Sequence, residues 1–363
     1  MTDCRRTPWA QATLAAVVVG LLSSAAVAQN QDPCPERLAP EMLIAENLNS
    51  QQQRQITEYA GCWAARIVDA DERQITRARM QLREPLGQQG SSTAFNNLYD
   101  QVVAEELAPA MQDEREIVRL NTMIVVTRLS RESALPLVAD GLADDNPAVR
   151  YWAAKAVRNL AGQTQIRSPQ RLELLSHLTD LLQQEDAEAI VEQVMLAIVE
   201  LEIPQAQREM LNAMDGRIRF HMQNPGQPLR AERSAMNRLF QQLISQAAND
   251  PSVEPIIRQL AQVALRYHDF AALQLESREA ELNQRLEDDY RQAIGLTDQI
   301  LRFIHEGRGQ QSAPPSIANA VRVGDWSYVR AQAEQWRTIL SRPPFNFQRE
   351  QLELPQPEQT ATP

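Results

Sequence analysis

Apolar residues recur at helical spacing along most of the chain, in segments separated by turn-forming residues. No stretch shows sustained alternation of β-branched and polar residues between turn signals, which is the pattern typical of strands. The expected fold class is therefore all-α. The positions of the breaks predict helices over residues 38–47, 51–69, 72–84, 93–110, 114–129, 132–142, 147–161, 169–183, 187–201, 205–222, 230–248, 252–267, 270–306 and 316–341.

One pattern repeats in the middle of the chain. Asp144 begins a D-x-x-x-x-V-R motif that ends at Arg150, and the same motif runs from Asp113 to Arg119, 31 residues earlier. A weaker copy begins at Glu185, 41 residues after Asp144. An apolar helix follows each copy at matching offsets. Because one helical pair cannot bury its apolar face alone, this repetition predicts that successive pairs stack on one another.

The repeated motif resembles the HEAT-repeat family, whose unit is two antiparallel helices with an acidic turn and a Val-Arg pair in the second helix. The resemblance covers about residues 98–201, and weaker helical pairs extend it to about residue 268. It implies a right-handed α-α superhelix in which turn acids and helix arginines form ladders between adjacent repeats. Val191 replaces the arginine in the third copy, so the ladder is expected to stop there. The residues that the resemblance assigns to this structural ladder are Asp113, Arg119, Asp144 and Arg150.

The two ends of the chain differ from the repeats at 93–268. Residues 29–92 are predicted to form a helical N-terminal cap. Residues 269–343 form a C-terminal helical region with one long helix at 270–306, whose apolar side either folds back along the solenoid or pairs with another chain as a coiled coil. The segment 344–363 is rich in Pro, Gln and Glu and is predicted to be a disordered tail.

Residues 1–28 have the features of a secretory signal peptide. Arg5 and Arg6 precede an apolar stretch at 14–22 that leads into small residues, and cleavage is expected after Ala28. A retained N-terminal anchor is the alternative. No later segment is apolar for long enough to cross a bilayer. The expected location is therefore the periplasm or the extracellular medium.

Cleavage at that position removes Cys4 and leaves Cys34 and Cys62. An even number of cysteines in an oxidising compartment predicts one disulfide. Closing this loop would stabilise the folded protein by about 3.5 kcal/mol in the chain-entropy account, by restricting the unfolded chain. Two buried free thiols are the alternative.

The sequence contains none of the common catalytic motifs that we searched for. We find no metalloprotease, nucleophile-elbow, phosphate-loop or cysteine–histidine metal motif, and the four histidines are isolated, so neither a cofactor nor a metal is expected. The acid pairs Asp144-Asp145 and Asp288-Asp289 are interpreted as a capping cluster and a solvated helix face, respectively.

A net charge of −11 argues against nucleic acid as a partner.

One surface of the repeat motif is not explained by stacking. Tyr151, Lys155 and Arg158 form an aromatic and basic stripe at helical spacing. This stripe is a candidate surface for an acidic peptide or a saccharide, and an ordinary solvated helix face is the alternative. Trp152 lies closer to the apolar face of the helix and is expected between repeats.

These observations favour an exported, non-enzymatic HEAT-like scaffold that binds a protein or peptide partner. The expectation of a binding partner rests on the architecture, because stacked helices form extended recognition surfaces. A structural or envelope-assembly protein that self-associates through 270–306 is the first alternative. A lyase-like enzyme factor is the second, since some HEAT-like proteins resemble bilin lyase subunits. The oligomeric state stays open.

Overall fold

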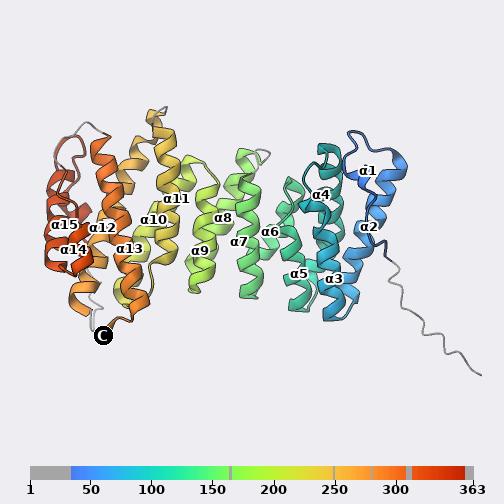
Figure 1. The fold of residues 1–363 in the computed structure, drawn as a ribbon, viewed down its shortest axis with the longest axis horizontal. Helices are drawn as coiled ribbons and strands as arrows, with labels where there is room; N and C mark the ends of the chain where they lie inside the picture. Colours follow the sequence, from blue (N-terminus) through green and yellow to red (C-terminus); the bar gives the residue numbers. More distant parts are fainter. Residues whose placement is uncertain (1–33, 163–165, 248–249, 279–280, 308–312, 356–363) are drawn as a thin grey trace, which may run out of the picture.

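The structure is a computed structural model that describes residues 34–162, 166–247, 250–278, 281–307 and 313–355. Within these ranges all the regular elements are helices, and they stack side by side into an elongated array that runs from α1 to α15 (Figure 1). The prediction of an all-α, HEAT-like solenoid is confirmed. The proposed signal peptide at 1–28 lies outside the described residues.

The array consists of helical pairs whose helices range from 8 residues in α6 to 25 residues in α12. Short 3-10 turns at Pro85–Gly87, Ala108–Gln112, Glu132–Ala134 and Pro251–Val253 join or precede some of the helices. The α-helices are α1 (Pro40–Leu43), α2 (Ser50–Asp69), α3 (Glu72–Arg83), α4 (Thr93–Leu107), α5 (Glu116–Val126), α6 (Leu135–Leu142), α7 (Pro147–Ala161), α8 (Ser168–Gln184), α9 (Glu188–Glu200), α10 (Pro204–Gln223), α11 (Arg230–Ala247), α12 (Glu254–Arg278), α13 (Gln284–Glu306), α14 (Ala318–Val323), α15 (Trp326–Leu340) and α16 (Arg349–Leu352).

Successive helices alternate between two parallel rows. Helices α3, α5, α7, α9, α11 and α13 each contact the next member of the series, and we call this series the B row. The first helices of the pairs, among them α6, α8, α10 and α12, form the other series, which we call the A row. Each pair buries its apolar faces between the two rows, so one hydrophobic core runs along the array.

Capping residues and small side chains determine where α7 begins and how closely it packs. The Asn146 side chain accepts a hydrogen bond from the backbone N–H of Ala148 at 2.8 Å, and Pro147 occupies the first helical position, where no N–H is needed. Ala153 is fully buried. A Cβ added at Gly141 of α6 would lie 2.8 Å from the Met123 sulfur and 3.0 Å from the Ala153 Cβ, so a larger residue would require Met123 and α7 to shift.

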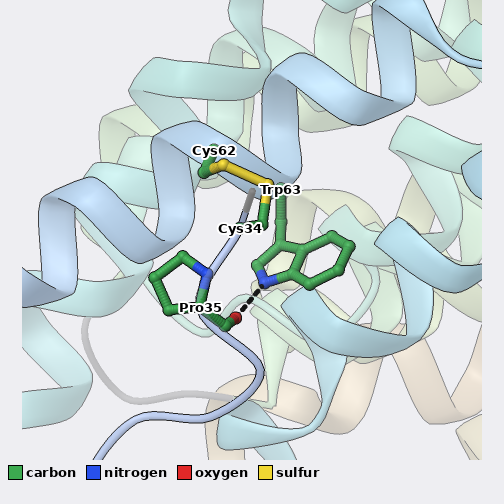
Figure 2. Close-up of a disulfide and its surroundings, with 4 residues drawn as sticks. All are labelled: Cys34, Pro35, Cys62 and Trp63. Atoms are coloured by element: carbon green, nitrogen blue, oxygen red, sulfur yellow. Dashed lines mark hydrogen bonds between the residues drawn. A yellow bond between two sulfur atoms is a disulfide. The ribbon is translucent and has the colours of Figure 1, made fainter. Parts of the chain in front are cut away.

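The N-terminal segment is fastened to α2 by a disulfide (Figure 2). Cys34 and Cys62 are joined with a Cα–Cα distance of 5.5 Å, as the cysteine count predicts. The indole N–H of Trp63 donates to the Pro35 carbonyl at 2.9 Å, next to the bridge. Trp63 is 1% exposed, so the disulfide holds the incoming chain over a buried aromatic side chain.

The predicted single helix at 270–306 is wrong. Helix α12 continues to Arg278, and a separate helix α13 begins at Gln284, where the Asn283 side chain accepts a hydrogen bond from the Leu286 N–H at 3.0 Å. An asparagine cap of this kind favours a new helix start over continuation. The two helices pack against each other, and the apolar side chains predicted for one long face are buried within the chain, including Leu275, Tyr290, Ile294 and Leu301.

The predicted disordered tail is also wrong for residues 344–355. Phe345 and Leu352 are both 0% exposed, and α16 contacts α12. The composition of this segment is polar, but these two apolar side chains fill the end of the core. Residues 356–363 of the predicted tail lie outside the described residues.

Candidate functional site

The arginines of the repeated motif connect neighbouring repeats. Arg119 of α5 donates to both carboxylate oxygens of Asp144, with Nε–Oδ2 and Nη2–Oδ1 distances of 2.6 and 3.1 Å. Its Nη1 donates to the Asp113 carbonyl at 2.8 Å, within its own repeat. The Asp144 side chain is 5% exposed, so this is a buried, charge-assisted contact.

The second ladder contact has the same form. Arg150 of α7 donates through Nε and Nη2 to Glu185 Oε2, at 3.0 and 2.7 Å, and through Nη1 to the Asp144 carbonyl at 3.0 Å. Each arginine therefore reaches forward to the acid of the next copy. Glu185 is the last acid in the series, because Val191 replaces the arginine of its copy and is fully buried.

Asp113 takes a different place from the one that the repeat motif implies. Its carboxylate accepts from Arg115, with an Nη2–Oδ2 distance of 2.8 Å, rather than from an arginine of the preceding repeat. The side-chain hydrogen bond from Arg115 is the largest cause that lowers the pKa of Asp113. Asp113 therefore caps the beginning of the ladder.

The aromatic and basic stripe of α7 lies on the B row. Lys155 places its Nζ 4.6 Å from the centre of the Trp152 ring, and the Tyr151 and Trp152 rings meet edge to face at 5.6 Å. All three side chains are half-buried. A cation held over an indole face is attracted by the ring quadrupole, so the three side chains form one preorganised cluster.

Arg158 is tied to the neighbouring repeat. Its Nη1 donates to Gln193 Oε1 of α9 at 2.7 Å. The acceptor is a neutral amide, so this bond does not neutralise the positive charge of Arg158. The structure therefore brings Tyr151 and Lys155 together through Trp152, and holds Arg158 on the side of the stripe that faces α9.

The neighbouring B-row helices carry apolar residues at the repeat positions equivalent to Tyr151 and Lys155. Leu120 precedes Tyr151 by the same 31 residues that separate the first two motifs, and Leu196 follows Lys155 by the 41 residues that separate the second and third. Both are half-buried. Sequence reasoning did not identify them, although the repeat offset was available to do so. We call the set Leu120, Tyr151, Trp152, Lys155 and Leu196 the B-row patch.

Two of the remaining candidate residues, Asp289 and His221, have structural partners. Asp289, which the sequence places on a solvated face, is 7% exposed; it accepts from the Leu229 N–H at 2.5 Å and from Arg233 Nη2 at 3.0 Å. The prediction of a solvated face is therefore wrong for Asp289. The sequence gives no local sign of this contact, because the partner is about 60 residues away. His221 contacts Glu232 at 2.9 Å. In the part of the chain that the structure describes, no group of three or more metal-ligating side chains converges.

The contact between His221 and Glu232 belongs to a buried charge cluster between α10 and α11 that also includes Arg217. Glu232 is 0% exposed. Burial alone would raise the pKa of Glu232, but hydrogen bonds and positive charge from His221 and Arg217 lower it to about 2. This acid is therefore held ionised and joins two helices of the solenoid.

Comparison with known proteins finds a family-model match in the middle of the chain. Residues 104–199 match the family model described as HEAT repeats. A search of curated proteins and a search of solved structures each found no match. No helix in the described ranges has both the length and the hydropathy needed to cross a bilayer.

Proposed function

We propose, from the HEAT repeats at 104–199, that the chain is an exported scaffold that binds a protein or peptide partner on the B-row patch. The single observation that carries this proposal is the patch itself. It joins half-buried aromatic, aliphatic and cationic side chains across three neighbouring helices, α5, α7 and α9. Trp and Tyr are among the side chains that most often supply the binding energy at protein interfaces.

The ladder supports the proposal by fixing the spacing of these helices. Arg119 connects the repeat of α5 to that of α7, and Arg150 connects α7 to the turn before α9. Side chains on such a framework lose little conformational freedom when a partner binds, because their positions are already held. The ladder also accounts for the acids of the motif, so the patch is the part of the motif that is left for recognition.

A non-enzymatic role is part of the proposal. HEAT-repeat scaffolds are typically not enzymes, and the acid pairs that offered general acid/base chemistry serve structural contacts here. Asp144 accepts from Arg119, and Asp289 accepts from Arg233. Export is supported by the N-terminal pattern of the sequence and by the Cys34–Cys62 disulfide.

Quantitative affinity capture tests this proposal. The wild-type chain and the double variant Tyr151→Ser/Lys155→Gln would each be immobilised and exposed to native envelope extract, and bound proteins would be quantified by mass spectrometry. The matched control is Leu172→Ser/Arg208→Gln, which removes one apolar group and one cation from exposed positions on the A row.

We expect a protein that the wild type and the control both capture and that the B-row variant loses by about tenfold or more. Equal capture by all three chains would contradict binding on the B-row patch. Loss of the same protein in the control would place the interaction on the A row.

A further inference from the structure

Three arginines gather where the C-terminal ends of α3 and α5 meet. Arg79 of α3 donates through Nη1 to Asn121 Oδ1 of α5 at 2.9 Å, which sets the two helices side by side. One turn farther along α3 is Arg83, and Arg128 follows the end of α5. Because the two helices run in the same direction in the B row, these side chains lie at the same edge of the solenoid. We call Arg79, Arg83 and Arg128 the arginine cluster.

The arginine cluster has no carboxylate partner among the described residues. Arg79 donates to an amide, and neither Arg83 nor Arg128 forms an ion pair there. Burial lowers the pKa of Arg83, and the positive charges of Arg128 and Arg79 lower it further. The Nε atoms of Arg79 and Arg83 are buried without an acceptor. The three cations therefore repel one another, and no carboxylate of the described residues neutralises their charge.

Two acids of this region, Glu84 and Asp100, face other groups. Glu84, next to Arg83 in sequence, lies 4.0 Å from Arg37. Asp100 accepts from the N–H and the hydroxyl of Ser130, at 2.8 and 2.7 Å, and Arg131 is the cation whose charge acts on it. Although the protein has a net charge of −11, no carboxylate of the described residues forms an ion pair with the arginine cluster.

The helix dipole accounts for only part of this arrangement. One basic residue near a helix C-terminus is favourable because of the partial negative charge there. It gives no reason to bring three arginines together without a carboxylate between them, since like charges at close range are destabilising. Such an arrangement is typical of a site that an anionic group completes.

The same edge continues toward the B-row patch. Asn159 donates through Nδ2 to the Thr127 carbonyl at 2.5 Å, which joins the end of α7 to the end of α5 beside Arg128. Arg158, the neighbour of Asn159, donates to the amide of Gln193 rather than to a carboxylate. Lys155 of the B-row patch is three residues before Arg158, on the adjacent turn. A partner on the patch would therefore extend naturally onto the basic edge.

We propose that the arginine cluster binds the carboxylates of an acidic peptide segment in the partner. This inference rests on the proposed function and names the chemistry of the partner. The planar guanidinium fork matches a carboxylate and can bind it through two parallel hydrogen bonds. A nucleic acid fits less well, because a long polyanion would meet the net negative charge of the rest of the chain.

Fluorescence anisotropy with a short fluorescein-labelled oligo-glutamate peptide tests the assignment on the full chain. An oligo-glutamine peptide of equal length measures binding that does not depend on charge. The test variant is Arg83→Gln/Arg128→Gln. The matched control is Arg208→Gln/Arg219→Gln, which changes the net charge by the same amount at exposed positions of α10.

We expect the wild type and the control to bind oligo-glutamate at least about tenfold more tightly than oligo-glutamine, and the test variant to lose that preference. The preference should weaken as salt is raised. If the double variant fails to fold, Arg128→Gln alone, at an exposed position, should still reduce the preference.

The assignment is overturned if the wild type does not distinguish the two peptides, or if the test and control variants lose equal affinity. Tighter binding of a single-stranded oligonucleotide of equal length would also overturn it in favour of a nucleic acid. These outcomes are separate from those of the proposed function, because capture that depends on Tyr151 and Lys155 can succeed while oligo-glutamate fails to bind.

Discussion

At the residue scale, the structure separates acids and arginines that hold the fold from those that are available for recognition. Arg119 and Arg150 use their guanidinium groups on buried carboxylates of the next repeat. Their positions were predictable because the D-x-x-x-x-V-R motif is local and repeats. Asp289 and Glu232 were not predictable as structural acids, since their partners come from other helices and leave no local signal.

The ladder predicts a specific loss of stability on substitution. Arg150→Ala should lower the free energy of unfolding by about 1–3 kcal/mol, because it leaves the 7% exposed Glu185 carboxylate without its charged partner. Arg238 forms a similar two-bond contact with Glu200 between α11 and α9, but its side chain is 46% exposed. Arg238→Ala is therefore the matched control, with an expected loss of about 0–1 kcal/mol.

Urea denaturation followed by circular dichroism measures both variants. Equal losses in the two variants would show that burial does not strengthen the ladder. Unchanged stability of Arg150→Ala together with weaker partner binding would instead make Arg150 a recognition residue.

The buried cluster of Glu232 predicts a dependence of stability on pH. Its pKa is lowered from 4.5 to about 2 in the folded chain, so the stabilisation is fully present above pH 4.5 and is lost as the pH falls toward 2. The contribution is on the order of 3 kcal/mol. Glu232→Gln should lower stability at neutral pH and remove this part of the dependence on pH.

Comparing the free energy of unfolding of the wild type and Glu232→Gln between about pH 5 and about pH 2.5 isolates this group from the other carboxylates. The difference between the two proteins should shrink as the pH falls. A constant difference across that range would contradict the assignment of a lowered pKa to Glu232.

At the element scale, helices that begin with a strong local signal were predicted well. Asn146-Pro147 marks the start of α7, and the structure begins the helix at Pro147. The boundary between α12 and α13 was missed because Asn283 stands within a stretch that is otherwise helix-forming, and only the packing of two helices against each other reveals its role as a cap. Phe345 and Leu352 were missed for a related reason, since their burial depends on distant helices.

The disulfide is the element-scale feature with the clearest test. Cys62→Ser should lower the free energy of unfolding by about 3.5 kcal/mol in the chain-entropy account. It should also increase hydrogen exchange in the N-terminal segment around Pro35, which lies over Trp63. Non-reducing peptide mapping of the exported protein should recover Cys34 joined to Cys62. Free thiols at both positions in exported protein would contradict the pairing.

At the scale of the whole molecule, the all-α solenoid could be predicted because its order is local. Each repeat carries its own motif, and stacking follows from the need to cover each apolar face. The surface that a partner would use is harder to predict from the sequence. Tyr151 and Lys155 were identified from one helix, but Leu120 and Leu196 become part of the B-row patch only when the helices are placed side by side.

Self-association through the predicted 270–306 helix has lost its physical basis. Most of the apolar side chains that would have formed a coiled coil, among them Tyr290, Ile294 and Leu301, are buried within the chain, where α13 packs on α11 and α12.

The position of Lys155 allows the most direct test of binding on the B row. It is the single lysine of the chain, so an amine-reactive crosslinker attached to a lysine side chain reports from the B-row patch. The double variant Lys155→Arg/Arg208→Lys preserves the charge and moves that amine to an exposed position on the A row. Crosslinking in native envelope extract, followed by mass spectrometry, should join a partner to Lys155 of the wild type and not to the relocated lysine; equal crosslinking of that partner from both positions, or crosslinking from the A row alone, would contradict the central claim.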